Sequence, residues 1–345
     1  MDIPSTSRHE RAITDHLEEL LRAAPWLDVT RVGENLVART QLGRPLRLLL
    51  AGHTDTVPAN GNDRARVVGD VCWGLGSCDM KGGVAVLAEL ARTVAEPVVD
   101  VTYVFYECEE IEAQYNGVER LFRERPDLLR ADAAILAEPT GAQVEAGCQG
   151  TMRARLTYGG VRAHSARAWL GRNAIHRLAP SLTKLAAYRG RHVEIDGCLF
   201  REGLQAVGVE GGVAGNVVPD RATLTVNFRF APDRTASDAE AHVRDVLAVD
   251  ADDFELIDMA PGAAPSLGHP LLTALLVAIG RPPEAKLGWT DVSRFAARGV
   301  PATNFGPGDP SWAHHADERV TRADLETVYV VLKNLLERAD PHLDA

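Results

Sequence analysis

Residues 46–56 read LRLLLAGHTDT, an almost continuous apolar run that leads directly into a histidine and an aspartate. A run of this kind predicts a β-strand buried on both faces, which is typical of a parallel sheet covered by helices. Further strands are predicted at residues 36–39, 98–106 and 133–136. Apolar residues at helical spacing predict helices at residues 8–24, 84–94 and 117–125, with Ser5 to Ser7 as caps of the first. Strands that alternate with helices predict an α/β sheet with helices on both faces.

The pattern changes near Gly150. Beyond it, half-exposed alternating strands are predicted at residues 153–158 and 223–230, and helices at residues 174–188 and 237–247. A stretch rich in proline and glycine follows at residues 261–270, and helices return at residues 271–279, 293–297 and 325–337. We therefore predict one α/β domain, residues 1–150 and 264–345, that is interrupted by a small α+β domain at residues 151–263.

The chain has 345 residues, with 37 Lys and Arg against 48 Asp and Glu and a net charge of -11. So acidic a chain is a poor candidate for binding nucleic acid or an anionic membrane through bulk electrostatics, and we expect neither partner. Five scattered cysteines without a Cys-x-x-Cys pair predict neither a disulfide framework nor a zinc finger. No apolar run approaches the roughly 20 residues of a membrane helix, and no signal-peptide pattern is present. We expect a reduced, cytoplasmic protein.

Short motifs of acidic residues and histidine lie at the ends of the predicted elements. They are Gly52–Thr56, Gly76–Gly83, Cys108–Glu110, Glu138–Thr140 and His314–Glu318. Ligands of open α/β sheets gather outside the carboxyl ends of the strands, so these motifs are expected to meet there. Each of them alone is more often a surface loop or a satisfied core residue. The whole set together indicates a shared site.

The candidate metal ligands in these motifs are two imidazoles and three carboxylates. They are His53, Asp79, Glu110, Glu138 and His314. Zinc accepts both ligand types, and a carboxylate shared by two ions would hold them about 3.5–4 Å apart, as in two-metal hydrolases. With two zinc ions and a bridging hydroxide the charges sum to zero, and a neutral cluster costs far less to bury than a charged one. Glu109 then remains as a general base for water.

In their order and spacing these motifs resemble those of the di-zinc aminoacylase/carboxypeptidase family of metallopeptidases. The resemblance implies a zinc-peptidase-like mixed sheet flanked by helices, with an inserted α+β sandwich domain that serves dimerisation and acts as a lid. It also implies two zinc ions per subunit, with cobalt as a substitute, and Asp79 as the bridge between them. The other ligands would be His53 and Glu138 at one ion, and Glu110 and His314 at the other.

The same resemblance assigns roles to residues that are not metal ligands. Glu109 would be the base and proton shuttle, and Asp55 would orient the imidazole of His53 as its hydrogen-bond partner. Both follow the predicted buried strands directly in the chain.

Residues 160–166, GVRAHSA, resemble the family's Gly-x-x-Gly-His-Ser-Ala, with Ala163 in place of the second glycine. The resemblance implies that His164 reaches the active site of the partner subunit in a homodimer and helps to stabilise an oxyanion. Asn216 and Arg229 resemble substrate-contacting positions. A planar guanidinium suits the bidentate capture of a substrate carboxylate.

Three stretches resemble one subgroup of the family, whose substrate is N-succinyl-L,L-diaminopimelate. They are residues 147–152, 288–295 and 305–310, and Thr290 in the second is taken as a further substrate contact. The resemblance implies hydrolysis of this small molecule to succinate and L,L-diaminopimelate, on the route to lysine and peptidoglycan. A related N-acyl amino acid deacylase, such as one acting on acetylornithine, stays open as an alternative, as does a carboxypeptidase or dipeptidase. A non-catalytic zinc-binding dimer is disfavoured by the intact Glu109 and the complete ligand set.

Overall fold

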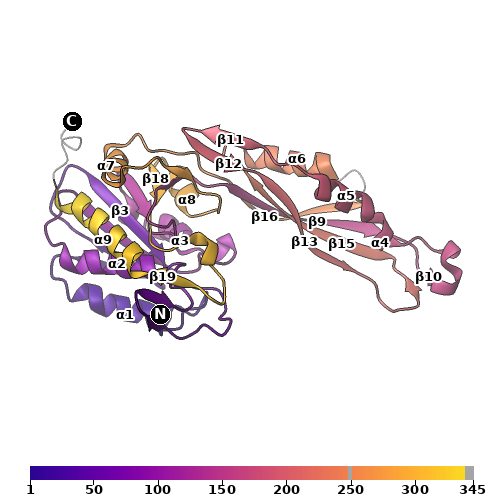
Figure 1. The fold of residues 1–345 in the computed structure, drawn as a ribbon, viewed down its shortest axis with the longest axis horizontal. Helices are drawn as coiled ribbons and strands as arrows, with labels where there is room; N and C mark the ends of the chain where they lie inside the picture. The colour runs from indigo at the N-terminus through magenta and orange to yellow at the C-terminus, as the bar shows by residue number, and fades with distance from the viewer. Residues whose placement is uncertain (248–250, 339–345) are drawn as a thin grey trace. The chain divides into compact units, whose positions relative to one another are not determined.

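The computed structural model describes residues 1–247 and 251–338. Residues 248–250 and 339–345, which fall in the predicted inserted domain and the predicted last segment, lie outside the described residues. The chain divides into two compact units (Figure 1). The first comprises Met1–Gly147, Pro265–Glu284 and the chain from Thr290 on, and the second comprises Cys148–Ala264 and Ala285–Trp289. Their assignment as a catalytic and a dimerisation domain stays a prediction.

The first unit is built on a mixed sheet of eight strands. In spatial order these are β1 (Asp28–Val32), β2 (Asn35–Arg39), β6 (Asp100–Tyr106), β3 (Arg47–His53), β7 (Ala133–Leu136), β18 (Ala302–Asn304), β8 (Glu145–Ala146) and β17 (Glu284–Ala285). β3 lies between β6 and β7 and runs parallel to both, and β18 runs parallel to β7. β1, β2 and β8 pair with antiparallel neighbours. The predicted mixed sheet is confirmed.

Helices cover this sheet on both faces. They are α1 (Arg11–Arg22), α2 (Lys81–Thr93), α3 (Gly117–Glu124), α7 (Pro270–Ile279), α8 (Val292–Ala296) and α9 (Arg322–Glu337). α2 packs between α1 and α9, and α9 also contacts α7, as Figure 1 shows for α1, α2 and α9. Leu48 and Leu50 of β3 belong to the core under these four helices, so the alternate residue Leu49 points to the opposite face. There α8 contacts β7 and β18.

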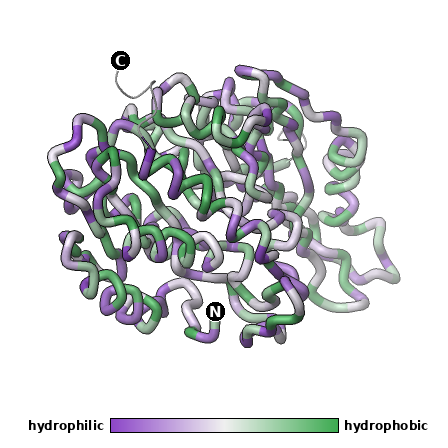
Figure 2. The backbone as a smooth tube through the Cα atoms, turned by 60° about the vertical axis from the view of Figure 1, so that its left-hand side comes forward, coloured by the Kyte–Doolittle hydropathy of each residue, from purple (hydrophilic) through white to green (hydrophobic). Residues whose placement is uncertain are grey.

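The outer helices are amphipathic, since hydrophobic and hydrophilic residues alternate along their turns (Figure 2). Their apolar faces therefore pack against the sheet. In α1, for example, Ile13, Leu17 and Leu21 are buried at helical spacing. No helix in the described part of the chain is long and apolar enough to cross a membrane.

A smaller three-stranded sheet supports two of the motif loops in the first unit. It consists of β4 (Arg66–Val68), β5 (Val71–Trp73) and β19 (Arg319–Thr321). Short 3-10 turns complete the unit at Ala113–Tyr115, Pro126–Leu129 and Pro310–Trp312. Since Asp79 follows β5 and His314 precedes β19, this sheet brings together two loops that are distant in sequence.

The second unit is an antiparallel sheet with helices on it. The sheet has the order β13 (Gly203–Gly211), β15 (Arg221–Phe230), β9 (Gly150–Gly159) and β16 (Asp253–Ala260). The helices are α4 (Ala174–Arg177), α5 (Ala179–Ala187) and α6 (Ala236–Leu247). Two small hairpins pair β10 (Ala163–His164) with β14 (Val217–Val218), and β11 (His192–Ile195) with β12 (Cys198–Arg201), and a 3-10 turn covers Ser165–Leu170. Alternate residues of β9 and β15 are buried, as their sequence pattern predicts.

Some local predictions are wrong. Ser5 to Ser7 do not cap α1, whose preceding residue is Glu10 and makes no side-chain cap. The helix predicted at residues 174–188 is divided into α4 and α5, with Pro180 in the first turn of the second helix. β13 and β16 were not predicted, because their exposed residues do not alternate regularly with buried ones.

Candidate metal centre and catalytic groups

Neighbouring parallel strands deliver acidic and histidine side chains to one edge of the main sheet. β3 ends at His53, while Glu109 and Glu110 follow β6 and Glu138 follows β7. Every residue of β6 and β7 is buried, so each apolar run is succeeded at once by polar groups. Because these strands are parallel, their carboxyl ends lie at the same edge.

The imidazole of His53 is held on one side and faces Asp79 on the other. Its Nδ1 lies 3.0 Å from the main-chain oxygen of Asp55 and 3.4 Å from the Asp55 carboxylate. Its Nε2 lies 3.1 Å from Oδ1 of Asp79. Acceptor oxygens lie on both sides of the ring, so although burial alone lowers the pKa of His53, its bonds to Asp55 and Asp79 raise this pKa well above its usual value. A cation at Nε2 has to displace the proton there, while the Asp55 oxygens keep a proton on Nδ1.

Asp79 faces two histidines with its two carboxylate oxygens. While Oδ1 points to His53, Oδ2 lies 3.6 Å from Nε2 of His314. The same Nε2 of His314 is 2.9 Å from Oε1 of Glu110. His314 has a φ of 63°, a left-handed conformation that residues other than glycine seldom adopt, and such conformations cluster at functional sites.

Asp55 fixes the loop after β6. Its Oδ1 accepts a hydrogen bond from the Glu109 nitrogen at 3.0 Å, and its Oδ2 accepts one from the Glu110 nitrogen at 3.1 Å. Burial alone raises the pKa of Asp55, but hydrogen bonds from His53, Ser7 and Glu109 outweigh it and hold this pKa below its ordinary value. Asp55 therefore stays ionised and ties the imidazole to the two glutamates.

The ligand atoms form overlapping groups, of which two share Asp79 and a third consists of His53, Glu109 and Glu110. His53, Asp79 and Glu138 make the first, and Asp79, Glu110 and His314 make the second. Within each group, one ligand atom per residue lies within 4.8 Å of the others. Since Asp79 belongs to both groups and presents one oxygen to each histidine, a shared carboxylate is available at the centre. This donor set fits two divalent cations.

A separate group, Glu10, Glu107 and Cys108, fits a cation less well. Oε1 of Glu107 accepts hydrogen bonds from Asn35 and from Arg120, and the Cys108 thiol donates to Glu10. Burial raises the pKa of this thiol, which disfavours the thiolate that a metal would bind.

The acid–base behaviour of the site follows from burial and from the crowding of carboxylates. Burial raises the pKa of Glu109 well above its usual range, and the nearby Glu110 and Glu138 add to this rise, against the opposing effect of His53. Such a carboxyl exchanges a proton near neutral pH more readily than an ordinary glutamate. The hydrogen bond to Glu110 raises the pKa of His314 to about 9, so a cation has to displace a proton from this imidazole.

Comparison with known proteins agrees with this geometry. The family model described as Peptidase family M20/M25/M40 matches residues 49–338, a range that includes both groups of ligands. The chain belongs to this peptidase family. The metallopeptidase family predicted from the motifs is thereby confirmed, and with it a hydrolase.

Two family members named as desuccinylases match almost the whole chain. A relative from Mycobacterium tuberculosis, named as a candidate succinyl-diaminopimelate desuccinylase, is 53% identical over 337 residues, which cover 97% of this chain and 95% of the relative. The succinyl-diaminopimelate desuccinylase of Corynebacterium glutamicum is 47% identical over 345 residues, covering 97% and 94% of the two chains.

Solved structures of the family share the fold. A tripeptidase from Staphylococcus aureus superposes with a TM-score of 0.79 at 21% identity, over 97% of this chain and 94% of the other. The YXEP protein of Bacillus subtilis, described as a dinuclear metal binding peptidase of the M20 family, gives a TM-score of 0.70 at 17% identity, over 97% and 93%. Identities this low carry the fold alone.

The structure brings together most of the site residues predicted from the sequence, all of them in the first unit. These are His53, Asp55, Asp79, Glu109, Glu110, Glu138 and His314. Thr290 is also in this unit, but it is buried and its hydroxyl donates to Oδ1 of Asn304. Its contact with substrate stays a prediction.

The other predicted site residues, His164, Asn216 and Arg229, lie in the second unit, and their roles also stay predictions. His164 is exposed, and its Nδ1 accepts a hydrogen bond from the Ala166 nitrogen at 3.0 Å. A neutral imidazole that accepts at Nδ1 carries its proton on Nε2, which leaves a donor of the kind an oxyanion needs.

Sequence reasoning did not find two residues beside the site. Asp291 is fully buried, accepts hydrogen bonds from Asn116 and Arg294, and contributes to the raised pKa of Glu109. Ser7 donates a hydrogen bond to Asp55. Asp291 lies in a stretch quoted for its resemblance, whereas no local pattern distinguishes Ser7 from a capping serine.

Proposed function

We propose that this family member is a zinc-dependent amide hydrolase that converts N-succinyl-L,L-2,6-diaminopimelate and water to succinate and L,L-2,6-diaminopimelate. The observation that carries the proposal is the combination of two overlapping ligand groups around Asp79 with desuccinylase relatives at 53% and 47% identity over nearly the whole chain. This reaction belongs to the synthesis of lysine and peptidoglycan precursors.

The residues of the first unit suit such a hydrolysis. When bound, two divalent cations supply Lewis acidity, which polarises an amide carbonyl and lowers the pKa of water. Glu109 takes a proton from the attacking water and returns it to the leaving nitrogen, a role that its raised pKa supports. Asp55 keeps Glu109 in place through the backbone and keeps His53 oriented for metal binding.

Stabilisation of the negative oxygen is assigned to His164 of the partner subunit. The hydrogen bond that its Nδ1 accepts from Ala166 supports a proton on Nε2, and a positioned donor of this kind stabilises an oxyanion. We assign Arg229 and Asn216 to the carboxylates of the substrate, and Thr290 to its binding as well.

Two zinc ions per subunit, with cobalt as a substitute, are part of the proposal. Zinc is supported by the donor set of two imidazoles and three carboxylates, since a site for calcium or magnesium would be built from oxygen alone. A cytoplasmic location is also proposed, on the scattered and odd number of cysteines.

A homodimer through the second unit completes the proposal. β13 is an edge strand of its sheet, and it exposes Val207 and Val209 at 56% and 50%. An exposed apolar edge strand is a ready surface for pairing with a second copy.

The deciding experiment is turnover of N-succinyl-L,L-diaminopimelate beside N-acetylornithine and a dipeptide, with zinc-loaded wild type and with Glu109→Gln. Selective cleavage of the succinylated compound, lost in Glu109→Gln, supports the proposal. Better cleavage of acetylornithine or of the dipeptide keeps the hydrolase and replaces the substrate. Zinc binding without turnover of any compound would favour the non-catalytic dimer.

A further inference from the structure

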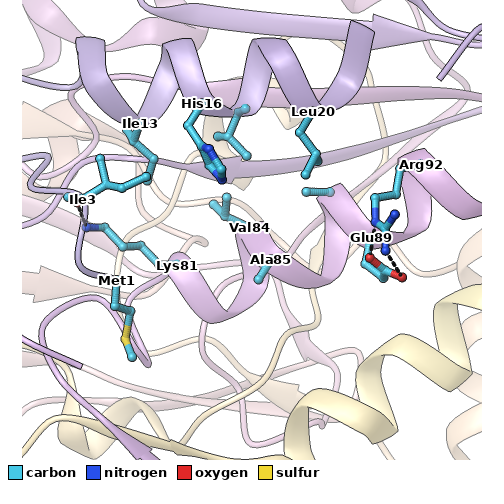
Figure 3. A pocket seen from close by; sticks show the side chains of 12 residues that line it. Met1, Ile3, Ile13, His16, Leu20, Lys81, Val84, Ala85, Glu89 and Arg92 are labelled. Carbon is cyan, nitrogen blue, oxygen red and sulfur yellow. Dashed lines mark hydrogen bonds and ion pairs between the residues drawn. The ribbon is translucent and has the colours of Figure 1, made fainter. Parts of the chain in front are cut away.

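The segment from Ile3 to Glu10, here called the N-terminal strap, runs beside the loops that carry the catalytic groups. At its start, Nζ of Lys81 in α2 donates to the Ile3 oxygen at 2.8 Å, the dashed contact beside Ile3 in Figure 3. The Ile3 side chain packs against the hydrophobic core and lines a pocket with Ile13 of α1 (Figure 3). The strap is therefore anchored to both helices.

Further along, the strap follows the loop after β3 as a short parallel pair. The Thr56 nitrogen donates to the Ser5 oxygen at 2.9 Å, and the Ser7 nitrogen donates to the Thr56 oxygen at 3.3 Å. The Ser5 hydroxyl donates to the Thr54 oxygen at 2.7 Å. The two backbone hydrogen bonds, which do not involve the Ser5 hydroxyl, hold the Ser7 side chain beside the loop after β3.

The Ser7 hydroxyl donates a hydrogen bond of 2.7 Å to Oδ2 of Asp55. That oxygen also accepts from the Glu110 nitrogen, while Oδ1 accepts from the Glu109 nitrogen. Hydrogen bonds to an ionised acceptor are short and about twice as strong as neutral ones, so the serine fixes the rotation of a carboxylate that is 0% exposed.

Glu10, at the end of the strap, binds the backbone of the same loop after β6. Oε1 of Glu10 accepts hydrogen bonds from the Arg8 nitrogen at 2.9 Å and from the Cys108 nitrogen at 3.1 Å. Three consecutive backbone nitrogens, at residues 108 to 110, are thus held by Glu10 and by an Asp55 that Ser7 orients. No other side-chain hydroxyl of the strap reaches Asp55 in the described residues.

We propose that Ser7 is a positioning residue for the hydrolysis: through Asp55 it fixes the backbone of Glu109 and Glu110, and so the placement of the base and of one metal ligand. The inference rests on the proposed function for its kinetic consequence. The effect of Ser7 on the two hydrogen bonds from the Glu109 and Glu110 nitrogens to Asp55 can be tested without substrate or metal.

A matched set of variants tests this. Ser7→Ala removes the hydroxyl, Ser7→Thr retains it, and Ser5→Ala deletes the same atoms from a strap residue that does not touch Asp55. Mutation of a residue that hydrogen-bonds to a metal ligand typically lowers activity about 10–100-fold. Ser7 is one hydrogen bond further from the metal, because it bonds to Asp55, which in turn bonds to the ligand His53. We expect kcat to fall about tenfold in Ser7→Ala with KM nearly unchanged, and to stay close to wild type in Ser5→Ala and Ser7→Thr.

A double-mutant cycle with Asp55→Ala separates positioning from general stability. If Ser7 acts through Asp55, Ser7→Ala speeds hydrogen exchange at residues 108–111 no further in the Asp55→Ala background, and this readout does not need an active enzyme. Additive increases in exchange, or an equal loss of kcat in Ser5→Ala, would overturn the proposal.

Hydrogen exchange of the peptide that contains residues 108–111 measures, without substrate, how firmly Asp55 holds these backbone amides. Ser7→Ala should speed exchange of these amides about tenfold, whereas Ser5→Ala should not. Unchanged exchange in Ser7→Ala contradicts the positioning role. Faster exchange together with a wild type that does not cleave the succinylated substrate would instead keep the role of Ser7 and reject the proposed function.

Discussion

The buried carboxylate of Glu318 accepts a hydrogen bond from the backbone nitrogen of Asp79, at 3.1 Å. The same oxygen accepts a second bond from the preceding nitrogen, of Cys78, at 3.0 Å. A side chain at the end of the His314–Glu318 motif thus orients the loop that carries the carboxylate shared by both ligand groups. Two motifs that are more than 200 residues apart in the chain are joined at the centre of the site.

Glu318→Ala should weaken metal binding, because it leaves the Cys78 and Asp79 nitrogens without their acceptor and frees the Asp79 loop to move. Mutation of a residue that orients a metal ligand typically weakens metal affinity about 10–100-fold. Glu318→Gln keeps an acceptor oxygen and should lose much less. Competition with a chelator measures both, and wild-type affinity in Glu318→Ala would contradict the prediction.

The number of cations held per chain should depend on which ligand is removed. Asp79→Ala removes the carboxylate common to both groups, so we expect both cations to be lost, whereas Glu138→Ala affects one group and should leave about one. Metal analysis after dialysis gives the counts. Retention of one cation in Asp79→Ala would show that the carboxylate is not shared.

Glu109→Gln should lower kcat strongly while leaving metal content and KM close to wild type. The amide keeps the shape and the backbone contact to Asp55, but it cannot accept the proton. Loss of a general base typically costs about 10²–10⁴ in rate. Steady-state kinetics and metal analysis on one preparation check this, and Glu112→Gln, an exposed residue in the same loop, serves as control.

The sequence allowed the centre of the site to be predicted because its signals are local. His53 and the Glu109–Glu110 pair come directly after apolar runs, and a buried parallel strand can place its last residue only at one edge of the sheet. Contacts between distant segments left no such signal. Ser7 and Asp55 are 48 residues apart, and a serine before a helix looks like a cap whether or not it is one. β13 was not predicted because most of its residues are exposed, so its sequence does not alternate between hydrophobic and polar residues.

The second unit should lose stability in acid through Glu202. Burial raises the pKa of Glu202, but hydrogen bonds from Arg191 and Arg234 outweigh it and lower this pKa from 4.5 to about 2. A depressed pKa means that its stabilisation is present above about pH 4.5 and disappears as the pH falls toward about 2. The shift corresponds to about 3 kcal/mol in the free energy of unfolding.

Glu202→Gln isolates this contribution. Urea unfolding should show the variant about 3 kcal/mol less stable at neutral pH, with the difference shrinking toward zero as the pH approaches about 2. Asp233→Asn, which removes a more exposed partner of Arg191, should cost at most about 1 kcal/mol. A difference between wild type and Glu202→Gln that does not change with pH would refute the assignment.

His164 provides a test of the dimer and of the trans role together. Glu109→Gln and His164→Ala should each be nearly inactive alone. If the proposed dimer forms and His164 acts in trans, the subunit with intact Glu109 in a mixed dimer receives His164 of the partner subunit, and one of the two sites is complete. Random reassociation makes about half of the dimers mixed, and activity should return to about a quarter of wild type.

The matched control mixes Glu109→Gln with Asp55→Ala. Each of these variants lacks a residue in the first unit of its own chain. A His164 supplied by the other subunit cannot replace that residue, so activity should stay at background. If His164 acted within its own subunit, the first mixture would also stay at background, because each chain would then lack one of the two residues. Recovery in the first mixture alone therefore requires both a dimer and a histidine supplied in trans.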